Sequence, residues 1–362
     1  MPTLRDAHLR HARYYLHVLW RGVALYKQGG GEIKQALDLF DAESANISIA
    51  QQWGAEHADN DAEAASICNE YPNAAVLFLN LRLLPSERLK WFESAMNAAR
   101  RLNDREAEQW HTGNLGRAYG DIGDARRALN YFQQVLSISR EIGDRSSEAL
   151  SLSNSASAHC DLGDPLAAIE LLKEALSIIR EVGDREEEGG ILGKLGTAHS
   201  LLHQYHIAID YYRQQLNISQ EFKALRSEAE ARVNIGIIYR QHRRPDLALK
   251  EFRAAFSIYE ELEDYRNVGA TLNNMGLAHL DFRNYEAANQ AFDAQLTMCR
   301  ETEDVRGEGR ALANKALTLD EMGERAGAIH LAEASLNIFE QLEAPEAIEV
   351  RAILSNWYDK SA

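Results

Sequence analysis

The sequence repeats its pattern of core residues every forty positions, without an insertion, through most of its length. One column of this repeat, meaning a set of positions that lie forty residues apart, holds only alanine: Ala128, Ala168, Ala208, Ala248, Ala288 and Ala328. Three further columns hold large apolar residues, and one holds only glycine or alanine. They are Leu136, Leu176, Leu216, Phe256, Leu296 and Leu336; Ile138, Ile178, Ile218, Ile258, Met298 and Ile338; Phe132, Leu172, Tyr212, Phe252 and Phe292, a column that lapses at Ala332; and Gly116, Ala156, Gly196, Gly236, Gly276 and Ala316. A fixed period of this size indicates like units that bury a continuous core only by packing on their neighbours.

Each unit is expected to consist of two amphipathic helices. In the unit that starts at residue 105, apolar residues recur at three- and four-residue steps over 107–122 and again over 125–142. Gly143 can adopt the left-handed conformation past the second helix, and Asp144 can cap the helix that follows. Similar Gly-Asp pairs occur at 123–124, 163–164 and 183–184. We expect Gly116 and Ala128 to lie where the two helices cross, and Phe132 and Leu136 to fill the space to the neighbouring unit.

The repeat register divides the chain into three parts. Residues 1–64 do not follow the repeat and show two long helical patterns, 4–28 and 32–57, which Gly29-Gly30-Gly31 separates as a turn. Repeats occupy 65–344: a degenerate unit at 65–104, then units at 105–144, 145–184, 185–224, 225–264, 265–304 and 305–344. The degenerate unit rests on four residues that fall on later columns, Pro85, Leu89, Phe92 and Met96. Residues 345–362 are expected to form a capping helix that begins at Pro345 and contains Ile348, Ile353, Leu354 and Trp357.

Composition restricts the partners of the chain. The formal net charge is −16, a sign that repels phosphate backbones and argues against nucleic acid. No apolar run approaches the roughly 20 residues that cross a bilayer, so no membrane partner is expected. Three widely spaced cysteines, Cys68, Cys160 and Cys299, suit free thiols in a reducing compartment. We therefore expect a cytoplasmic protein, and the sequence leaves its oligomeric state open.

The pattern resembles the tetratricopeptide repeat. Leu115-Gly116, Tyr119, Ala128 and Phe132 look like that family's signature, although its usual period is 34 residues. The longer unit is similar to those of Pins-type Leu-Gly-Asn polarity proteins and kinesin light chains. The resemblance implies an all-α, right-handed superhelical solenoid of antiparallel helix pairs that binds proteins.

A second resemblance concerns the N-terminal part. The run 11–15 (His-Ala-Arg-Tyr-Tyr), Glu43, Asn46-Ile47, Ala50 and Trp53, then Glu87-Arg88 and Trp91, look like the junction that leads into the C-terminal repeats of bacterial signalling ATPases of the STAND class. The nucleotide-binding module of those proteins is absent from the sequence. If the resemblance holds, the chain corresponds to their sensor arm, either alone or as a piece of a larger protein.

An asparagine column is the strongest candidate site. It consists of Asn114, Asn154, Lys194, Asn234, Asn274 and Asn314. In the tetratricopeptide family this position on the first helix faces the concave groove, where asparagine contacts the backbone of a bound peptide. An amide offers both a donor and an acceptor, so a ladder of amides can hold an extended peptide of any sequence. The alternative is that each asparagine bonds a neighbouring helix. Because lysine rarely tolerates full burial, Lys194 favours the groove.

The same register assigns further residues to the groove: Trp110, Arg117, Asp121, Asp161, Arg240, Gln241, Asp281, Arg310 and Glu321. Arg310 and Asn314 lie four residues apart on one helix face and could together hold a carboxylate. His159, His199 and His279 share the column of Tyr119 in separate units, so we expect them to be packing substitutes rather than metal ligands. No catalytic arrangement, nucleotide motif or metal site is apparent, and no cofactor is expected.

These observations favour a non-catalytic scaffold or sensor that binds a protein or peptide in its concave groove. The second resemblance extends this to the sensor arm of a signalling ATPase. The alternative is a signalling-peptide receptor of the Rap type, which also joins an N-terminal helical bundle to a repeat array, and it rests on architecture alone. An enzyme is the least favoured class.

Overall fold

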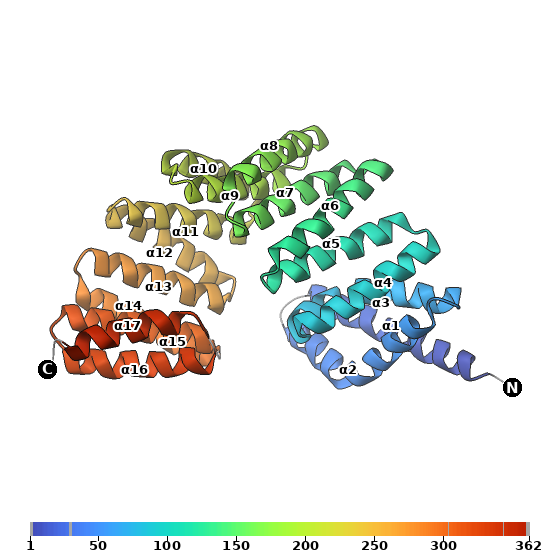
Figure 1. Cartoon of the computed structure of the whole chain (residues 1–362), viewed down its shortest axis with the longest axis horizontal. Coiled ribbons are helices and arrows are strands. Elements are labelled where there is room, and N and C mark those ends of the chain that lie inside the picture. Colours follow the sequence, from blue (N-terminus) through green and yellow to red (C-terminus); the bar gives the residue numbers. More distant parts are fainter. Residues whose placement is uncertain (1–2, 29–30, 303, 343, 360–362) are drawn as a thin grey trace. The chain divides into compact units, whose positions relative to one another are not determined.

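The computed structural model describes residues 3–28, 31–302, 304–342 and 344–359, and within these ranges the chain forms seventeen α-helices and no strand (Figure 1). The expected all-α repeat fold is confirmed. The chain divides into two compact units, Met1–Gly183 and Asp184–Ala362.

Unit 1 is a succession of antiparallel helices in which each packs on the next. Its helices are α1 (Leu4–Gln28), α2 (Gly31–His57), α3 (Ala62–Arg82), α4 (Pro85–Leu102), α5 (Arg105–Asp121), α6 (Ala125–Ile142), α7 (Arg145–Asp161) and α8 (Pro165–Val182). Helix α1 also contacts α3, so the N-terminal pair shares a core with the first repeat-like hairpin. The two long N-terminal helices have almost the expected bounds. The expected turn at 29–31 falls mostly on Gly29 and Gly30, which lie outside the described residues.

Unit 2 continues the same hairpin pattern. Its helices are α9 (Arg185–Leu201), α10 (Tyr205–Phe222), α11 (Leu225–Gln241), α12 (Pro245–Glu261), α13 (Tyr265–Asp281), α14 (Tyr285–Glu301), α15 (Val305–Glu321), α16 (Arg325–Gln341) and α17 (Glu346–Asp359). The first helices of successive hairpins also contact one another, α9 with α11, α11 with α13 and α13 with α15. They therefore form a layer of their own, whose open side we call the first-helix face.

The turns have the expected chemistry. Gly143 follows α6 with φ 77°, a conformation that favours glycine, and the side chain of Asp144 accepts a hydrogen bond from the backbone nitrogen of Ser147. Gly123 and Asp124 form the corresponding turn inside the hairpin. The geometry does not depend on glycine, because unit 2 places His203, Lys223, Arg243, Glu263 and Arg283 at positive φ in the equivalent positions.

Four of the repeat hairpins close around a contact between a glycine and an aromatic ring. A Cβ atom added to Gly236 of α11 would lie 2.5 Å from Cε1 of Phe252 in α12, which is closer than atoms can pack. The same contact joins Gly116 to Phe132 and Gly276 to Phe292, also at 2.5 Å. The ring of Phe132 therefore packs over Gly116 of its own hairpin. Phe132 also shares a core cluster with Ala158 of the following hairpin, so it packs toward the neighbouring unit as well, as expected.

The two columns compensate each other. In the six repeats from residue 105 to 344, this column holds glycine where the residue sixteen positions later is aromatic, whereas the degenerate repeat pairs Val76 with Phe92: the four pairs are Gly116 with Phe132, Gly196 with Tyr212, Gly236 with Phe252, and Gly276 with Phe292. The units with a smaller partner carry alanine instead, and these pairs are Ala156 with Leu172 and Ala316 with Ala332. Since interiors are packed to nearly crystalline density, a larger ring requires a smaller residue beneath it. Where the aromatic column has Ala332 in place of a ring, the glycine column accordingly has the larger residue Ala316.

Gly236→Ala tests this contact. The extra methyl group gains about 1 kcal/mol in helix propensity but overpacks the ring of Phe252 at a cost of about 1–3 kcal/mol. We expect a net loss of stability in chemical denaturation. Adding Phe252→Leu, which recreates the Ala156–Leu172 pair, should recover about 1 kcal/mol or more relative to the sum of the single changes. A clear stabilisation by Gly236→Ala alone would show that the ring does not lie there.

A buried glutamate ties successive hairpins together, and the sequence analysis missed it. Glu148 of α7 accepts a hydrogen bond from Nε of Arg140 in the preceding helix at 2.7 Å and pairs with Arg145 at 2.5 Å. Burial alone would raise the pKa of Glu148, but the two arginines outweigh it and lower the pKa. Glu108 makes the same pair of contacts one repeat earlier. The signal was available, since glutamate recurs at 108, 148, 188, 228 and 308.

The last helix, α17, packs its buried residues Val350, Leu354 and Trp357 in one cluster with α16. Ile353 is partly buried against the same cluster. Ile348 was expected on this apolar face, but its side chain is 69% exposed. The buried position belongs instead to Ala347, because the face of the helix is set by Val350 and Leu354, three and seven residues further on.

A buried histidine links the degenerate repeat to the next one. His111 of α5 is fully buried, and its Nε2 lies 2.7 Å from Oδ1 of Asn69 in α3. Its Nδ1 has no hydrogen-bond partner within the described ranges. Burial lowers the pKa of His111 to about 4.

The unfolded state should therefore take up a proton at this position near pH 6.5, before the folded state does. His111 should cost the fold about 3 kcal/mol as pH falls from about 6.5 to about 4. His111→Gln, measured by denaturation at several pH values, should make the decline shallower over that window. His206→Gln, at an exposed position of α10, is the matched control. If the stability of His111→Gln and of the wild type depended on pH in the same way, the lowered pKa of His111 would be contradicted.

Candidate functional site

The asparagine column lies on the first helices, but its members are not equivalent. Asn114 of α5 is buried, donates to the carbonyl oxygen of Trp110 at 2.9 Å and accepts from Arg117 at 2.6 Å. Asn314 of α15 donates to Oδ1 of Asn273 at 2.7 Å. Asn314 thus bonds a neighbouring first helix, which was the alternative that the sequence left open, whereas both bonds of Asn114 stay within α5.

Two other amides are unengaged. Asn234 of α11 and Asn274 of α13 are half-buried, and their side chains make no hydrogen bond within the part of the chain that the structure describes. Because α11 and α13 contact each other, the two amides belong to adjacent helices of one layer. They present donors and acceptors on the first-helix face of unit 2.

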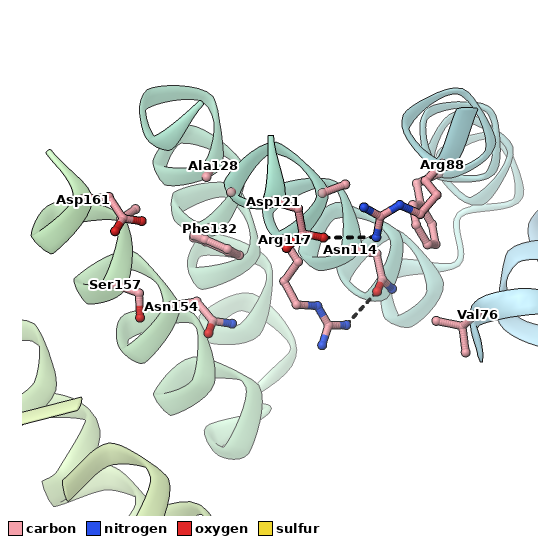
Figure 2. Close-up of a pocket in the computed structure, with 14 residues that line it drawn as sticks. Val76, Arg88, Asn114, Arg117, Asp121, Ala128, Phe132, Asn154, Ser157 and Asp161 are labelled. Carbon is pink, nitrogen blue, oxygen red and sulfur yellow. Dashed lines mark hydrogen bonds and ion pairs between the residues drawn. The ribbon is translucent and has the colours of Figure 1, made fainter. Parts of the chain in front are cut away.

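In unit 1, a hollow of about 600 Å³ opens between α4, α5, α6 and α7 and brings together several of the expected residues (Figure 2). Asn114, Arg117 and Asp121 reach it from α5, and Asn154 and Asp161 reach it from α7. Arg88 of α4 approaches from the other side and forms an ion pair with Asp121 at 3.1 Å. We call this the α5–α7 hollow. Charges of both signs line it.

In unit 2, a hollow of about 400 Å³ lies between α9, α10 and α11, and we call it the α9–α11 hollow. Lys194 and Asn234 of the asparagine column line it, together with Glu186, Glu187 and Glu230. Burial lowers the pKa of Lys194, although nearby Glu187 opposes this. Burial, Asp184 and Glu186 raise the pKa of Glu187. Burial is the largest cause of both shifts.

The sequence analysis did not single out the three glutamates. Glu230 occupies the same column as Trp110 and Arg310, which were assigned to the groove, so the register contained this signal. The side chain of Glu230 is exposed at the rim, but the surrounding walls still desolvate it and raise its pKa. Gly190 is the glycine of that column.

Trp110, Arg240 and Arg310 line neither of these two hollows. Trp110 is partly buried, and its ring packs edge-on against Phe92 in the core of unit 1, with 6.0 Å between centroids. Arg240 lies 3.8 Å from Asp281 and lines a separate hollow with Gln241 and Arg283. Arg310 lies 3.7 Å from Glu346 at the start of α17. Arg310 and Asn314 could together hold a carboxylate from a ligand. In the structure, Arg310 instead lies near the carboxylate of Glu346 from the same chain.

The histidine column behaves as packing. His199 is buried, stacks on Tyr211 at 5.3 Å and bonds Gln204. Among the described residues, no group of three or more His, Cys, Asp or Glu side chains is placed to hold a metal ion. The described helices likewise include none that is both long and apolar enough to span a bilayer.

The repeats match known family models. Tetratricopeptide repeat models match residues 110–142, 147–221 and 227–301, together about half of the sequence. The chain belongs to the tetratricopeptide repeat family, as its signature residues implied. No curated protein gives a significant match to the sequence.

Solved structures share the fold at low identity. A signal transduction ATPase with numerous domains from Pyrococcus horikoshii, which has a tetratricopeptide repeat sensor, is 18% identical and aligns over 96% of this chain and 54% of its own, with a TM-score of 0.61. A Rap protein complexed with competence and sporulation factor is 13% identical over 97% of this chain and 98% of its own, with a TM-score of 0.58. BtubC from P. vanneervenii is 20% identical over 60% and 92%, with a TM-score of 0.54. The chain thus spans about half of the ATPase and nearly all of the Rap protein.

The difference between the hydrogen-bonded Asn314 and the unbonded Asn234 and Asn274 can be tested by measuring the stability of alanine variants. Replacing Asn234 and Asn274 by alanine together should leave the melting temperature unchanged or slightly raised, because no hydrogen bond is lost and alanine is the better helix former. Asn314→Ala in the same unit should cost about 0.5–1.5 kcal/mol, since it removes the bond to Asn273. A loss of about 1 kcal/mol or more per site in the double variant would mean that those amides are structural.

Proposed function

We propose that this chain is a non-catalytic interaction module that binds a polypeptide segment along the first-helix face. The observation that carries the proposal is the pair of unengaged amides, Asn234 and Asn274, on adjacent first helices. Each amide offers a donor and an acceptor, and a peptide backbone would supply the complementary acceptor and donor to each. The shallow hollows beside the column provide room for side chains of the segment.

The module has two candidate biological roles. The N-terminal motifs, and the alignment of 96% of this chain with part of an ATPase that has a tetratricopeptide repeat sensor, support the sensor arm of a bacterial signalling ATPase. The alignment with nearly the whole length of a Rap protein supports the alternative, a receptor for a short signalling peptide. At these identities only the fold is shared, so the two roles are separated by genetics. A nucleotide-binding domain encoded immediately upstream favours the first, and a short secreted-peptide gene next to it favours the second.

Selection from a random twelve-residue peptide library displayed on phage tests peptide binding directly. Selected peptides should bind the purified chain, and the double variant Asn234→Ala, Asn274→Ala should bind them about 5- to 150-fold more weakly, as loss of two hydrogen bonds predicts. Lys250→Ala and Glu260→Ala, at exposed positions of the second helix α12, are the control and should bind like the wild type. Equal affinity for the double variant and the wild type would refute the site.

A further inference from the structure

The α9–α11 hollow differs from the corresponding position of every other repeat. The column of Gly190 carries a side chain in the other units, namely Trp110, Leu150, Glu230, Ala270 and Arg310. No atom of the described chain would lie within 4 Å of a Cβ added to Gly190. Gly189 and Gly193, which also line the hollow, leave its floor without side chains. A side chain installed at position 190 would therefore occupy part of the hollow.

The lining of this space is predominantly acidic. Glu186 and Glu187 reach it from the first turn of α9, Glu230 reaches it from α11, and Lys194 is the one basic residue among the lining residues. Three carboxylates and one ammonium leave an excess of negative charge. This local excess has the same sign as the net charge of −16 on the chain, which attracts cationic segments from solution.

A second observation points to a hydrogen-bond donor from outside the chain. Gln215 of α10 lines the same hollow and is only 5% exposed. Its amide nitrogen donates to Oγ of Ser227 at 3.2 Å, but its Oε1 has no hydrogen-bond partner in the described structure. This oxygen would lie 2.6 Å from a Cβ on Gly193, so it rests against the bare backbone of the hollow's floor. A buried acceptor without a donor is uncommon and is satisfied when a donor enters.

We propose that the α9–α11 hollow receives one basic side chain, preferably arginine, from the polypeptide that binds the first-helix face. A guanidinium group offers five donors in a planar fork, which matches several acceptors at once: Glu187, Glu230 and the amide oxygen of Gln215. It would also balance the excess negative charge. The inference deepens the proposed function and rests on it, because Asn234, which is to bind the backbone, lines the same hollow.

The test uses a defined probe peptide, Ac-Gly-Ser-Gly-Ser-Arg-Ser-Gly-Ser-Gly-NH2, and the same peptide with citrulline, lysine or glutamate in place of arginine. Citrulline keeps the shape of arginine and removes its charge. Affinities are measured by NMR titration of the full chain. The arginine peptide should bind about 10- to 100-fold more tightly than the citrulline peptide, the usual range for a charge-assisted contact, with lysine between them and glutamate weakest.

Two kinds of variant locate the preference. Glu187→Gln with Glu230→Gln should abolish the difference between the arginine and citrulline peptides, whereas Glu260→Gln, at an exposed position of α12, should preserve it. Gly190→Leu, which installs the residue found at position 150, should block the hollow and abolish the preference without a change of charge. Circular dichroism confirms that each variant is folded.

The outcomes separate this inference from the proposed function. Equal binding of the arginine and citrulline peptides, no binding of either, or a preference that survives Gly190→Leu would overturn the arginine site. The peptide-binding proposal would still stand if phage-selected peptides lose affinity in the Asn234→Ala, Asn274→Ala variant. If that variant binds selected peptides normally while the arginine preference holds, the hollow binds a cation but the asparagine column does not bind the backbone.

Discussion

The contact between a glycine and an aromatic ring inside four of the repeat hairpins determines which face of their first helix packs on the second helix. In α11, Gly236 must face α12 because the ring of Phe252 lies directly over it. Residues two positions apart on an α-helix point about 200° from each other. Asn234 therefore points away from the second helix, and the repeat carries the same relation to Asn274 and Gly276. One steric requirement thus fixes the packing of the hairpin and turns the amide away from the second helix, although Asn114, in the same relation to Gly116, is buried.

Much of the scaffold could be predicted from the sequence, because the forces that shape it are local or periodic. Helix bounds follow from apolar spacing and from caps such as Asp144, and the forty-residue period multiplies each signal. The details that escaped prediction depend on pairs of side chains brought together only by folding. Three such details are the packing of the Phe132 ring over Gly116, the ion pair between Arg310 and Glu346, and the exposed position of Ile348. The acidic hollow beneath Glu230 could be recognised only once Gly190 and Gln215 were placed around it.

The candidate site illustrates how a repeat protein separates scaffold from specificity. The columns that pack hairpins hold nearly the same residue in every unit, whereas the column shared by Trp110, Gly190, Glu230 and Arg310 changes size and charge from one unit to the next. The α5–α7 hollow combines Arg88 and Arg117 with two aspartates, while the α9–α11 hollow is acidic. The two hollows would therefore present different charges to a bound polypeptide.

The central claim is that the amides of Asn234 and Asn274 bind a polypeptide backbone. The most direct measurement is the position of their side-chain NH2 resonances in a TROSY NMR titration with a phage-selected peptide, assigned through the two single alanine variants. The account predicts that both resonances shift with the same dissociation constant as the peptide and that exposed second-helix residues such as Lys250 stay in place. Unchanged asparagine resonances at saturating peptide, with shifts confined to second helices, would contradict it.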